Sequence, residues 1–491
     1  MNENSHRINQ SEQRNIYALF IRWLFLPLAL ILTLYVLLTY RVTMDDFFIT
    51  MRYARNLADG NGFVFNPGER VLGTTTPLLC LLMAVFSFFG MSEILAAKLI
   101  CSLALFGASI YIYRYFKLTR QEPLGFAAGL LVFFIMPLKQ LWGNEVPLCI
   151  FFIIGSLYYY KKEKWAVSAM FQSFYALTRM EGLLFLFILN ALLFWKKRKI
   201  IRGTLIPPTL ILLPWFIFSY LYFGDFFPNT LYAKAKQGGV EIWSPFSVYF
   251  IKTLKLLFLN GQWPFMSLLA WFGIFQLMKN RHFLLLSWIG IHQLSYLIIG
   301  VPGNYEWYFY PLWILFPLTV AGGIHFFAGS ADKLKLIRGR CKIVFAAFLC
   351  FMIFISLRQP YLNGFFLSRY NLYKTSTSYI TEHYEGKMEV IADEIGIFGY
   401  YLPEKIILDT AGLVHADIPP DAYYRYEYLV ETRNPKLIVQ CLYFYDEEKR
   451  GDPARSLDVN ISSGLSIKYD FVRLFNHARI DLMVRILERS R

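Results

Sequence analysis

The chain has 491 residues, of which 56% are hydrophobic, 19% aromatic and only 17% charged, and its mean hydropathy is +0.41. These values exclude a soluble globule with a single anchor and indicate a polytopic membrane protein. The formal net charge of +15 does not indicate nucleic acid as a partner, because many basic residues lie in short clusters between apolar runs, as cytoplasmic loops do. The six cysteines show neither a zinc-site spacing nor a disulfide framework.

The first apolar run covers residues 17–40 and is long enough, at about 36 Å as a helix, to cross a hydrocarbon core of roughly 30 Å. The sequence predicts about eleven membrane spans, some of them short: 17–40, 93–113, 124–141, 146–160, 165–177, 182–195, 203–222, 265–278, 283–300, 308–328 and 343–357. Residues 77–89 are apolar but too short to span, and we expect an interfacial helix there. The basic clusters then lie on the cytoplasmic side with the N-terminus, and the C-terminus lies outside.

The composition changes near Ser356 to that of a soluble domain. Short apolar runs separated by turns predict strands within 386–401, 404–413 and 435–445, and further strands are expected around 465–487. The sequence therefore predicts a transmembrane unit, residues 1–357, and a small extracytoplasmic α/β domain, residues 358–491. No glycine-rich phosphate-binding motif supports a nucleotide-consuming pump.

Two adjacent carboxylates, Asp45 and Asp46, follow the first span at the edge of the bilayer. A helix cap needs only one carboxylate, so the pair favours a functional role. The loop after them carries the basic residues Arg52 and Arg55, several aromatic side chains and glycine-rich turns. Acidic, basic and aromatic groups at one interface predict a site for a charged, partly apolar substrate.

Further polar residues lie at the outer ends of later spans in this topology. They are Glu145 in GNEVP, Arg179 and Glu181 in LTRMEG, Asn229, Tyr232 and Lys234 in the segment 224–236, and Trp307 and Tyr308 in the segment 301–311. Each has a structural interpretation as well: an ion pair, a cap, a solvated loop charge or an interfacial aromatic belt. Because several loops converge on one surface, we predict a polar external cavity over an apolar bundle.

These motifs together resemble the GT-C superfamily of integral membrane glycosyltransferases. DDFFITMRYARNLADGNGFVFNPGERVLGTTTP resembles its first-loop signature, and the resemblance continues through GNEVP, LTRMEG, FGDFFPNTLYAKAK, WYFYP and IGIFGYY…ILDTAGLV, over residues 40–415. The chain is similar to mycobacterial terminal arabinofuranosyltransferases and more distantly to lipid A aminoarabinose transferases and protein O-mannosyltransferases. The sequence departs from the family pattern at Leu72, at Met180 and at residues 144–146. These departures concern the identity of the transferred sugar more than the type of reaction.

The resemblance implies transfer of a sugar, with inversion, from a polyprenyl-phosphate donor to a hydroxyl of a cell-envelope glycan, lipid or protein. The active site and the C-terminal domain would lie on the extracytoplasmic side of the plasma or inner membrane. Asp45 or Asp46 would be the catalytic base, with a slight preference for Asp45. Cations would neutralise the leaving phosphate, in the order Arg179 and Lys234, then Arg52 and Arg55.

The resemblance also implies that Glu145 and Glu181 hold acceptor hydroxyls or orient those cations. Asn229, Tyr232, Trp307 and Tyr308 complete the expected substrate-binding set. No cofactor is required by the pattern, and a divalent cation stays open because no ligand spacing decides it.

Two other functions fit a polytopic chain. A transporter or flippase of lipid-linked saccharides would also bind an anionic lipid, but it predicts charges at the membrane midplane and an inverted repeat. A non-catalytic envelope-assembly protein would bind through its C-terminal domain and would not need the paired carboxylates. The clustering of acids at one face favours the enzyme.

Overall fold

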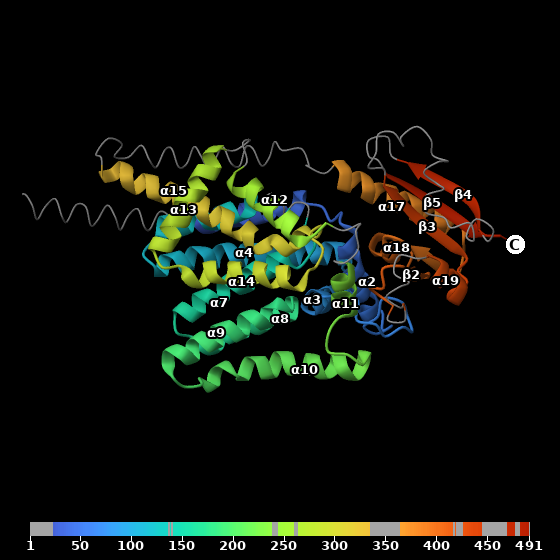
Figure 1. Cartoon of the computed structure of the whole chain (residues 1–491), viewed down its shortest axis with the longest axis horizontal. Coiled ribbons are helices and arrows are strands. Elements are labelled where there is room, and N and C mark those ends of the chain that lie inside the picture. Colours follow the sequence, from blue (N-terminus) through green and yellow to red (C-terminus); the bar gives the residue numbers. More distant parts are fainter. Residues whose placement is uncertain are drawn as a thin grey trace, which may run out of the picture.

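The structure is a computed structural model of the whole chain, and it describes residues 23–135, 138, 141–237, 244–259, 264–333, 364–415, 418, 426–443, 469–476 and 482–490. Long helices run side by side along the longest axis of the molecule, and a small sheet with its own helices lies at one end of them (Figure 1). This arrangement agrees with the predicted apolar bundle followed by a small α/β domain.

The helical part contains the apolar helix Trp23–Thr39 and a series of further helices. These are α2 (Asp45–Ala58), α3 (Pro77–Phe88), α4 (Glu93–Leu118), α5 (Glu122–Leu131) with η1 (Val132–Phe134), α7 (Val146–Lys161), α8 (Trp165–Thr178), α9 (Glu181–Lys197), η2 (Arg202–Thr204), α10 (Ile206–Phe223), α11 (Asn229–Gln237), α12 (Phe246–Phe258), α13 (Pro264–Lys279), α14 (Phe283–Ile299), η3 (Glu306–Phe309) and α15 (Tyr310–Lys333). Ten of the predicted spans coincide with described helices, and the eleventh, 343–357, lies outside the described residues.

Three segments of the described chain are long and apolar enough to cross a membrane alone: Glu93–Leu118, Arg202–Phe223 and Glu306–Phe327. The pair Met266–Lys279 and Phe283–Ile299 meets the test together, with a bend of 117° between its members. The remaining apolar helices are shorter, which is compatible with packing inside a bundle. On α10, Leu210 and Leu221 are 69% and 75% exposed, so this helix presents the apolar surface that a lipid bilayer covers.

The C-terminal domain consists of α17 (Gly364–His383), β1 (Glu389–Ala392), α18 (Ile395–Tyr401), β2 (Ile406–Asp409), α19 (Tyr426–Arg433), β3 (Leu437–Tyr443), β4 (Tyr469–Asn476) and β5 (Leu482–Arg489). The sheet order is β2-β1-β3-β5-β4. Strand β1 pairs in parallel with β2 and β3, whereas β5 pairs antiparallel with β3 and β4. The strands agree with the prediction, but β1 is followed by a helix rather than a turn, and the helix α17 was not predicted.

Parallel pairing brings the carboxyl ends of β1 and β2 to the same edge of the sheet. Helix α18 follows β1 there, and the turn at residues 410–415 follows β2. Apolar side chains of the strands, such as Ile391 and Ile438, are fully buried beneath α19. The core of the C-terminal domain thus fixes the sheet edge at the carboxyl ends of β1 and β2. This edge faces the segment that begins at Asp45.

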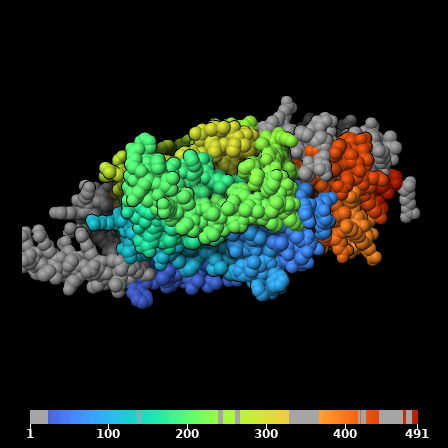
Figure 2. Space-filling view, turned by 90° about the horizontal axis from the view of Figure 1, so that it is seen from below, coloured from blue at the N-terminus to red at the C-terminus, as the bar shows by residue number. Residues whose placement is uncertain are grey.

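Residues 45–76, the first loop, join the bundle to the C-terminal domain; they lie between the two in the space-filling view (Figure 2). Helix α2 packs on α18, and Gly396 is required at the contact because a Cβ there would lie 1.9 Å from the carbonyl oxygen of Asp45. Such direct contact requires both segments to lie on the same side of the membrane, as the predicted topology has it. Whether α3 lies along the interface stays a prediction.

Candidate functional site

A pocket with about 500 Å³ of empty space opens between the first loop, α11 and η3. Its charged lining residues are Asp46, Glu145 and Lys234, and its aromatic wall includes Trp307. Leu413, from the turn after β2, closes part of the rim. The loops that the sequence predicts to converge therefore do meet, and the C-terminal domain contributes to the same pocket.

Asp46 and Lys234 form the ion pair of this pocket, with 3.3 Å between Oδ2 and Nζ. Asp46 lies in the first turn of α2, where the positive end of the helix dipole favours a carboxylate. Its side chain is 29% exposed, so a ligand can reach it. Lys234 is buried against aromatic rings, 3.8 Å from the ring centre of Tyr305 and 5.0 Å from that of Trp307, which stabilises its positive charge.

Asp45 points the other way and does not line the pocket. Its Oδ1 accepts a hydrogen bond from the Ile397 amide at 2.7 Å, and its Oδ2 accepts one from the Gly396 amide at 2.9 Å. Only 2% of the residue is exposed, and this burial raises the pKa of Asp45 well above its usual range. Because Asp45 caps the N-terminus of α18, the geometry favours Asp46 over Asp45 as the candidate base.

Arg179 links Glu145 and Glu181 in a buried cluster behind the pocket. Its Nε donates to Glu181 at 2.5 Å, one Nη donates to Glu145, and the other donates to the Tyr296 hydroxyl at 2.8 Å. Gly182 permits the tight α8–α9 hairpin, since a Cβ there would lie 2.4 Å from the Ala176 nitrogen. Two carboxylates neutralise this guanidinium, so the geometry does not favour the predicted contact with phosphate.

Arg52 and Arg55, the secondary phosphate candidates, do not line the pocket either. Arg52 is buried and donates to the carbonyls of Phe65, Gly399 and Lys405 and to the Asn66 side chain, at 2.6 to 3.1 Å. Arg55 donates to the Tyr400 carbonyl and pairs with Glu93, both at 2.8 Å. Both residues hold the C-terminal domain against the first loop.

We expect Arg52→Met to lower the free energy of unfolding by at least about 3 kcal/mol, because several buried acceptors lose a charged donor at once. Thermal unfolding of the purified full-length variant in detergent measures this effect. Arg70→Met is the control, because Arg70 is exposed and its described contact is the ring of Tyr222. Equal unfolding temperatures for the two variants would contradict the docking role of Arg52.

Asn229 and Tyr232, two residues of the expected substrate-binding set, do not line the pocket. The Asn229 side chain donates to the Gly412 carbonyl at 2.6 Å, and its backbone amide donates to the Leu72 carbonyl at 2.9 Å, so it fixes the start of α11 rather than a substrate. Tyr232 is 44% exposed and does not line the pocket. Tyr308 is buried, with its ring 5.4 Å from the Arg179 guanidinium and 5.9 Å from Lys234.

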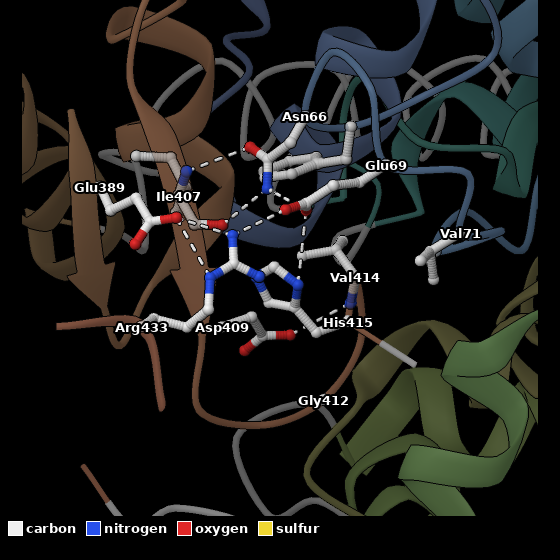
Figure 3. Close-up of polar contacts among 12 residues, drawn as sticks. Asn66, Glu69, Val71, Glu389, Ile407, Asp409, Gly412, Val414, His415 and Arg433 are labelled. Carbon is white, nitrogen blue, oxygen red and sulfur yellow. Dashed lines mark hydrogen bonds and ion pairs between the residues drawn. The ribbon is translucent and has the colours of Figure 1, made fainter. Parts of the chain in front are cut away.

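A polar cluster between the first loop and the C-terminal domain fixes the turn that includes Gly412, Val414 and His415 (Figure 3). Glu69 pairs with Arg433 at 3.0 Å and with His415 at 3.4 Å, and Arg433 also pairs with Glu389 at 2.7 Å. Asp409, at the end of β2, accepts hydrogen bonds from the backbone amides of residues 411, 413 and 414. The pocket rim is therefore held by the domain and the loop together.

The pocket also contains hydroxyl-bearing side chains. Thr230 belongs to the polar segment 224–236 that the sequence indicated, whereas sequence reasoning missed Thr50, Thr74, Thr75 and Thr76. The run of threonines at the end of the first-loop signature could have indicated them, but uncharged side chains carry little signal in a turn-rich loop. Tyr296, which holds Arg179, lies in the apolar helix α14, where nothing in the pattern distinguishes it.

A second, mainly apolar pocket of about 370 Å³ adjoins the first between α8, α9 and α10. Leu177, Leu212 and Trp215 are among its lining residues, and it shares Thr74 and Thr75 with the polar pocket. The two pockets together offer a polar end and an apolar end to one amphipathic ligand. Within the described residues, no group of three histidine, cysteine, aspartate or glutamate side chains is placed to hold a metal ion.

No protein-family profile and no curated protein sequence matches the chain. Solved structures do match in fold. ArnT from Cupriavidus metallidurans bound to undecaprenyl phosphate has a TM-score of 0.57 and 13% identity over 94% of this chain and 97% of that protein. An Archaeoglobus fulgidus oligosaccharyltransferase, tethered to an acceptor peptide, has a TM-score of 0.55 and 11% identity over 87% and 69%. The chain thus shares the fold of ArnT and of the archaeal oligosaccharyltransferase, and its apolar helices make it a multi-pass membrane protein.

Proposed function

We propose that this protein transfers a sugar from a polyprenyl-phosphate donor to an acceptor hydroxyl on the extracytoplasmic side of the cell membrane. The observation that carries the proposal is the Asp46–Lys234 pair, a carboxylate and an ammonium 3.3 Å apart in one accessible pocket. One group can take a proton and the other can neutralise a phosphate, which are the two tasks of this transfer.

In the proposed reaction the acceptor oxygen attacks the anomeric carbon of the donor sugar. The new glycosidic bond forms as the bond to the phosphate oxygen breaks, and direct displacement from the opposite side inverts the anomeric configuration. Asp46 accepts the acceptor proton, and Lys234 stabilises the negative charge that develops on the leaving polyprenyl phosphate. A phosphate at Lys234 would compete with Asp46 for the ammonium and leave the carboxylate free to act as a base.

Glu145 is the second carboxylate of the pocket, and we assign it to the acceptor hydroxyls. Arg179 holds one of its oxygens from behind and fixes its orientation. Arg179 is therefore a positioning residue. Glu181 completes the cluster and contacts His292 at 3.4 Å without lining the pocket.

The apolar pocket supports a lipid-linked donor over a soluble one. Thr74 and Thr75 line both pockets, so an apolar chain in the second pocket would lie next to a phosphate in the first. The transporter alternative is less favoured, because α2 and α11, which carry Asp46 and Lys234, lie beside the C-terminal domain at one end of the bundle (Figure 1).

Mass spectrometry of envelope glycans and polyprenyl lipids in a deletion strain tests the proposed activity. We expect loss of one sugar substituent and accumulation of the corresponding polyprenyl-phosphate sugar. Both changes should be reversed by the wild-type gene and not by a gene encoding Asp46→Asn. Complementation by that variant would contradict the proposal.

We expect Lys234→Met to weaken binding of undecaprenyl phosphate by about 10- to 150-fold, because a hydrogen bond to a charged group contributes about 1.5–3 kcal/mol. Binding to the purified full-length protein in detergent is the measurement. Lys236→Met is the matched control, since Lys236 lies on the same helix, is exposed and does not line the pocket. Unchanged affinity in Lys234→Met would remove the phosphate role from this residue.

A further inference from the structure

We propose that a threonine wall, formed by the hydroxyls of Thr50, Thr74, Thr76 and Thr230, is the subsite that binds the sugar hydroxyls of the lipid-linked donor. This inference rests on the proposed function and specifies which residues recognise the sugar. All four residues are buried and all four line the polar pocket. Buried hydroxyls beside an opening to ligand are the groups that a polyol can engage.

The wall lies next to both charged groups of the pocket. Thr50 follows Asp46 by four residues in α2, and Thr230 precedes Lys234 by four residues in α11. Residues four apart lie on the same face of a helix, one turn from each other. Each charged side chain therefore has a hydroxyl beside it, and residues 74–76 extend the wall between the two helices.

The hydroxyls form a connected group. Thr50 Oγ1 lies 2.9 Å from Thr74 Oγ1 and 3.4 Å from Thr76 Oγ1, and the last two are 3.4 Å apart. Thr230 Oγ1 donates to the Gly73 carbonyl. The segment is held in place by Tyr53, whose hydroxyl accepts from the Gly73 amide at 2.8 Å and donates to the Val71 carbonyl at 2.6 Å. The positions of the threonines are thus fixed before a ligand arrives.

A count of donors and acceptors favours a sugar over a phosphate at this wall. Each threonine hydroxyl has one donor and two acceptor lone pairs. The donor of Thr230 is used by Gly73, and the other three hydroxyls can donate to one another in turn. Thr74 Oγ1 also accepts a hydrogen bond from the Thr76 amide at 3.3 Å, so the free acceptor positions lie mainly on Thr50, Thr76 and Thr230. What is left is mostly acceptor capacity. Sugar hydroxyls donate to such groups, whereas an ionised phosphate only accepts and is matched by Lys234.

The apolar pocket places the donor sugar rather than the acceptor at the wall. That pocket meets the polar one at Thr74 and Thr75, where an isoprenoid chain would end at its phosphate. The group attached to that phosphate then lies within reach of Thr50, Thr74 and Thr76. Asp46, one helical turn from Thr50, is left to face the acceptor hydroxyl.

Binding of two kinds of lipid to purified full-length variants tests the inference. The probes are bare undecaprenyl phosphate and polyprenyl phosphates that carry arabinofuranose, aminoarabinose or mannose. We expect T50V and T74V each to weaken binding of the preferred sugar lipid by about 3- to 10-fold, the loss of one or two neutral hydrogen bonds. Binding of bare undecaprenyl phosphate should stay within twofold of wild type in T50V, and T74V, which alters the junction with the apolar pocket, should weaken it less than it weakens binding of the sugar lipid. T74S, which keeps a hydroxyl, should retain most of the affinity.

Thr33→Val is the matched control, because Thr33 is equally buried and hydrogen-bonded but lies in the helix Trp23–Thr39, away from the pocket. Retained binding of the bare lipid also shows that a variant is folded. If T74V, in the loop, does not fold, then T50V, in helix α2, still tests the inference. Equal weakening of both lipid classes, or no change in either, would overturn the sugar subsite and leave the proposed function standing. A wild-type protein that binds neither lipid would overturn the proposed function and this inference with it.

Discussion

Replacing Asp46 with asparagine should lower the rate of sugar transfer by about 10²–10⁴-fold, the usual contribution of a general base in the transition state. The substitution keeps the size of the side chain and removes its ability to take a proton. Donor binding should be largely retained, because the phosphate contact is assigned to Lys234. The measurement is the single-turnover rate of the purified variant with a polyprenyl-phosphate sugar and its acceptor, at saturating donor.

Asp45→Asn is the matched control, because it makes the same change one residue earlier. An asparagine has one acceptor oxygen, so it can satisfy only one of the Gly396 and Ile397 amides without rearrangement. We expect a lower unfolding temperature and a smaller loss of rate per folded molecule than in Asp46→Asn. The reverse order, with Asp46→Asn near normal, would return the base to Asp45.

Arg179→Met should lower the free energy of unfolding by about 3–5 kcal/mol, because it leaves the buried carboxylates of Glu145 and Glu181 without a cation. Methionine keeps much of the volume, so the loss reports on charge rather than on packing. Arg179→Lys should be intermediate, since an ammonium lacks the planar fork that reaches both carboxylates. The measurement is thermal unfolding in detergent.

A triple variant tests whether the loss of stability in Arg179→Met comes from the unpaired carboxylates of Glu145 and Glu181. Arg179→Met combined with Glu145→Gln and Glu181→Gln removes the uncompensated charges, and it should be more stable than Arg179→Met alone. If Arg179→Met instead unfolds like wild type while losing undecaprenyl phosphate binding, Arg179 contacts the donor phosphate, as the sequence pattern indicated.

The sequence predicted the helical bundle and the convergence of its loops because charged residues are rare in an apolar chain and are easily located. Asp46, Glu145 and Lys234 were found in this way, Trp307 was found as an aromatic residue at the end of a span, and all four line one pocket. The positions of ten helices of the bundle followed from hydrophobicity and length alone. Charge, hydrophobicity and length are properties of each segment by itself, so they can be determined from a single sequence.

The structural roles of Asp45, Arg52 and Asn229 could not be predicted in the same way. Their partners are backbone groups far along the chain; the Gly396 amide is 351 residues from Asp45. A backbone amide has no residue-specific signature, so a charged side chain that caps a distant helix looks the same in sequence as one that binds substrate. The threonine wall was missed for a related reason, since its significance comes from the proximity of α2, α11 and residues 73–76.

The contacts of the first loop mean that the membrane half of this protein is not a self-sufficient unit. A shortened chain that ended before Gly364 would expose or orphan the carboxylate of Asp45 and the guanidinium of Arg52, and α11 would lose the anchor that Asn229 finds at Gly412. Exchanging the C-terminal domain for that of a relative would face the same difficulty. Asp45 binds the C-terminal domain, and the next residue, Asp46, lines the pocket, so a change at the domain contact would also disturb the pocket. Chimeras intended to change the proposed sugar or acceptor are therefore better divided within the helices of the bundle than at the apparent domain boundary. The first loop then stays together with its own C-terminal domain.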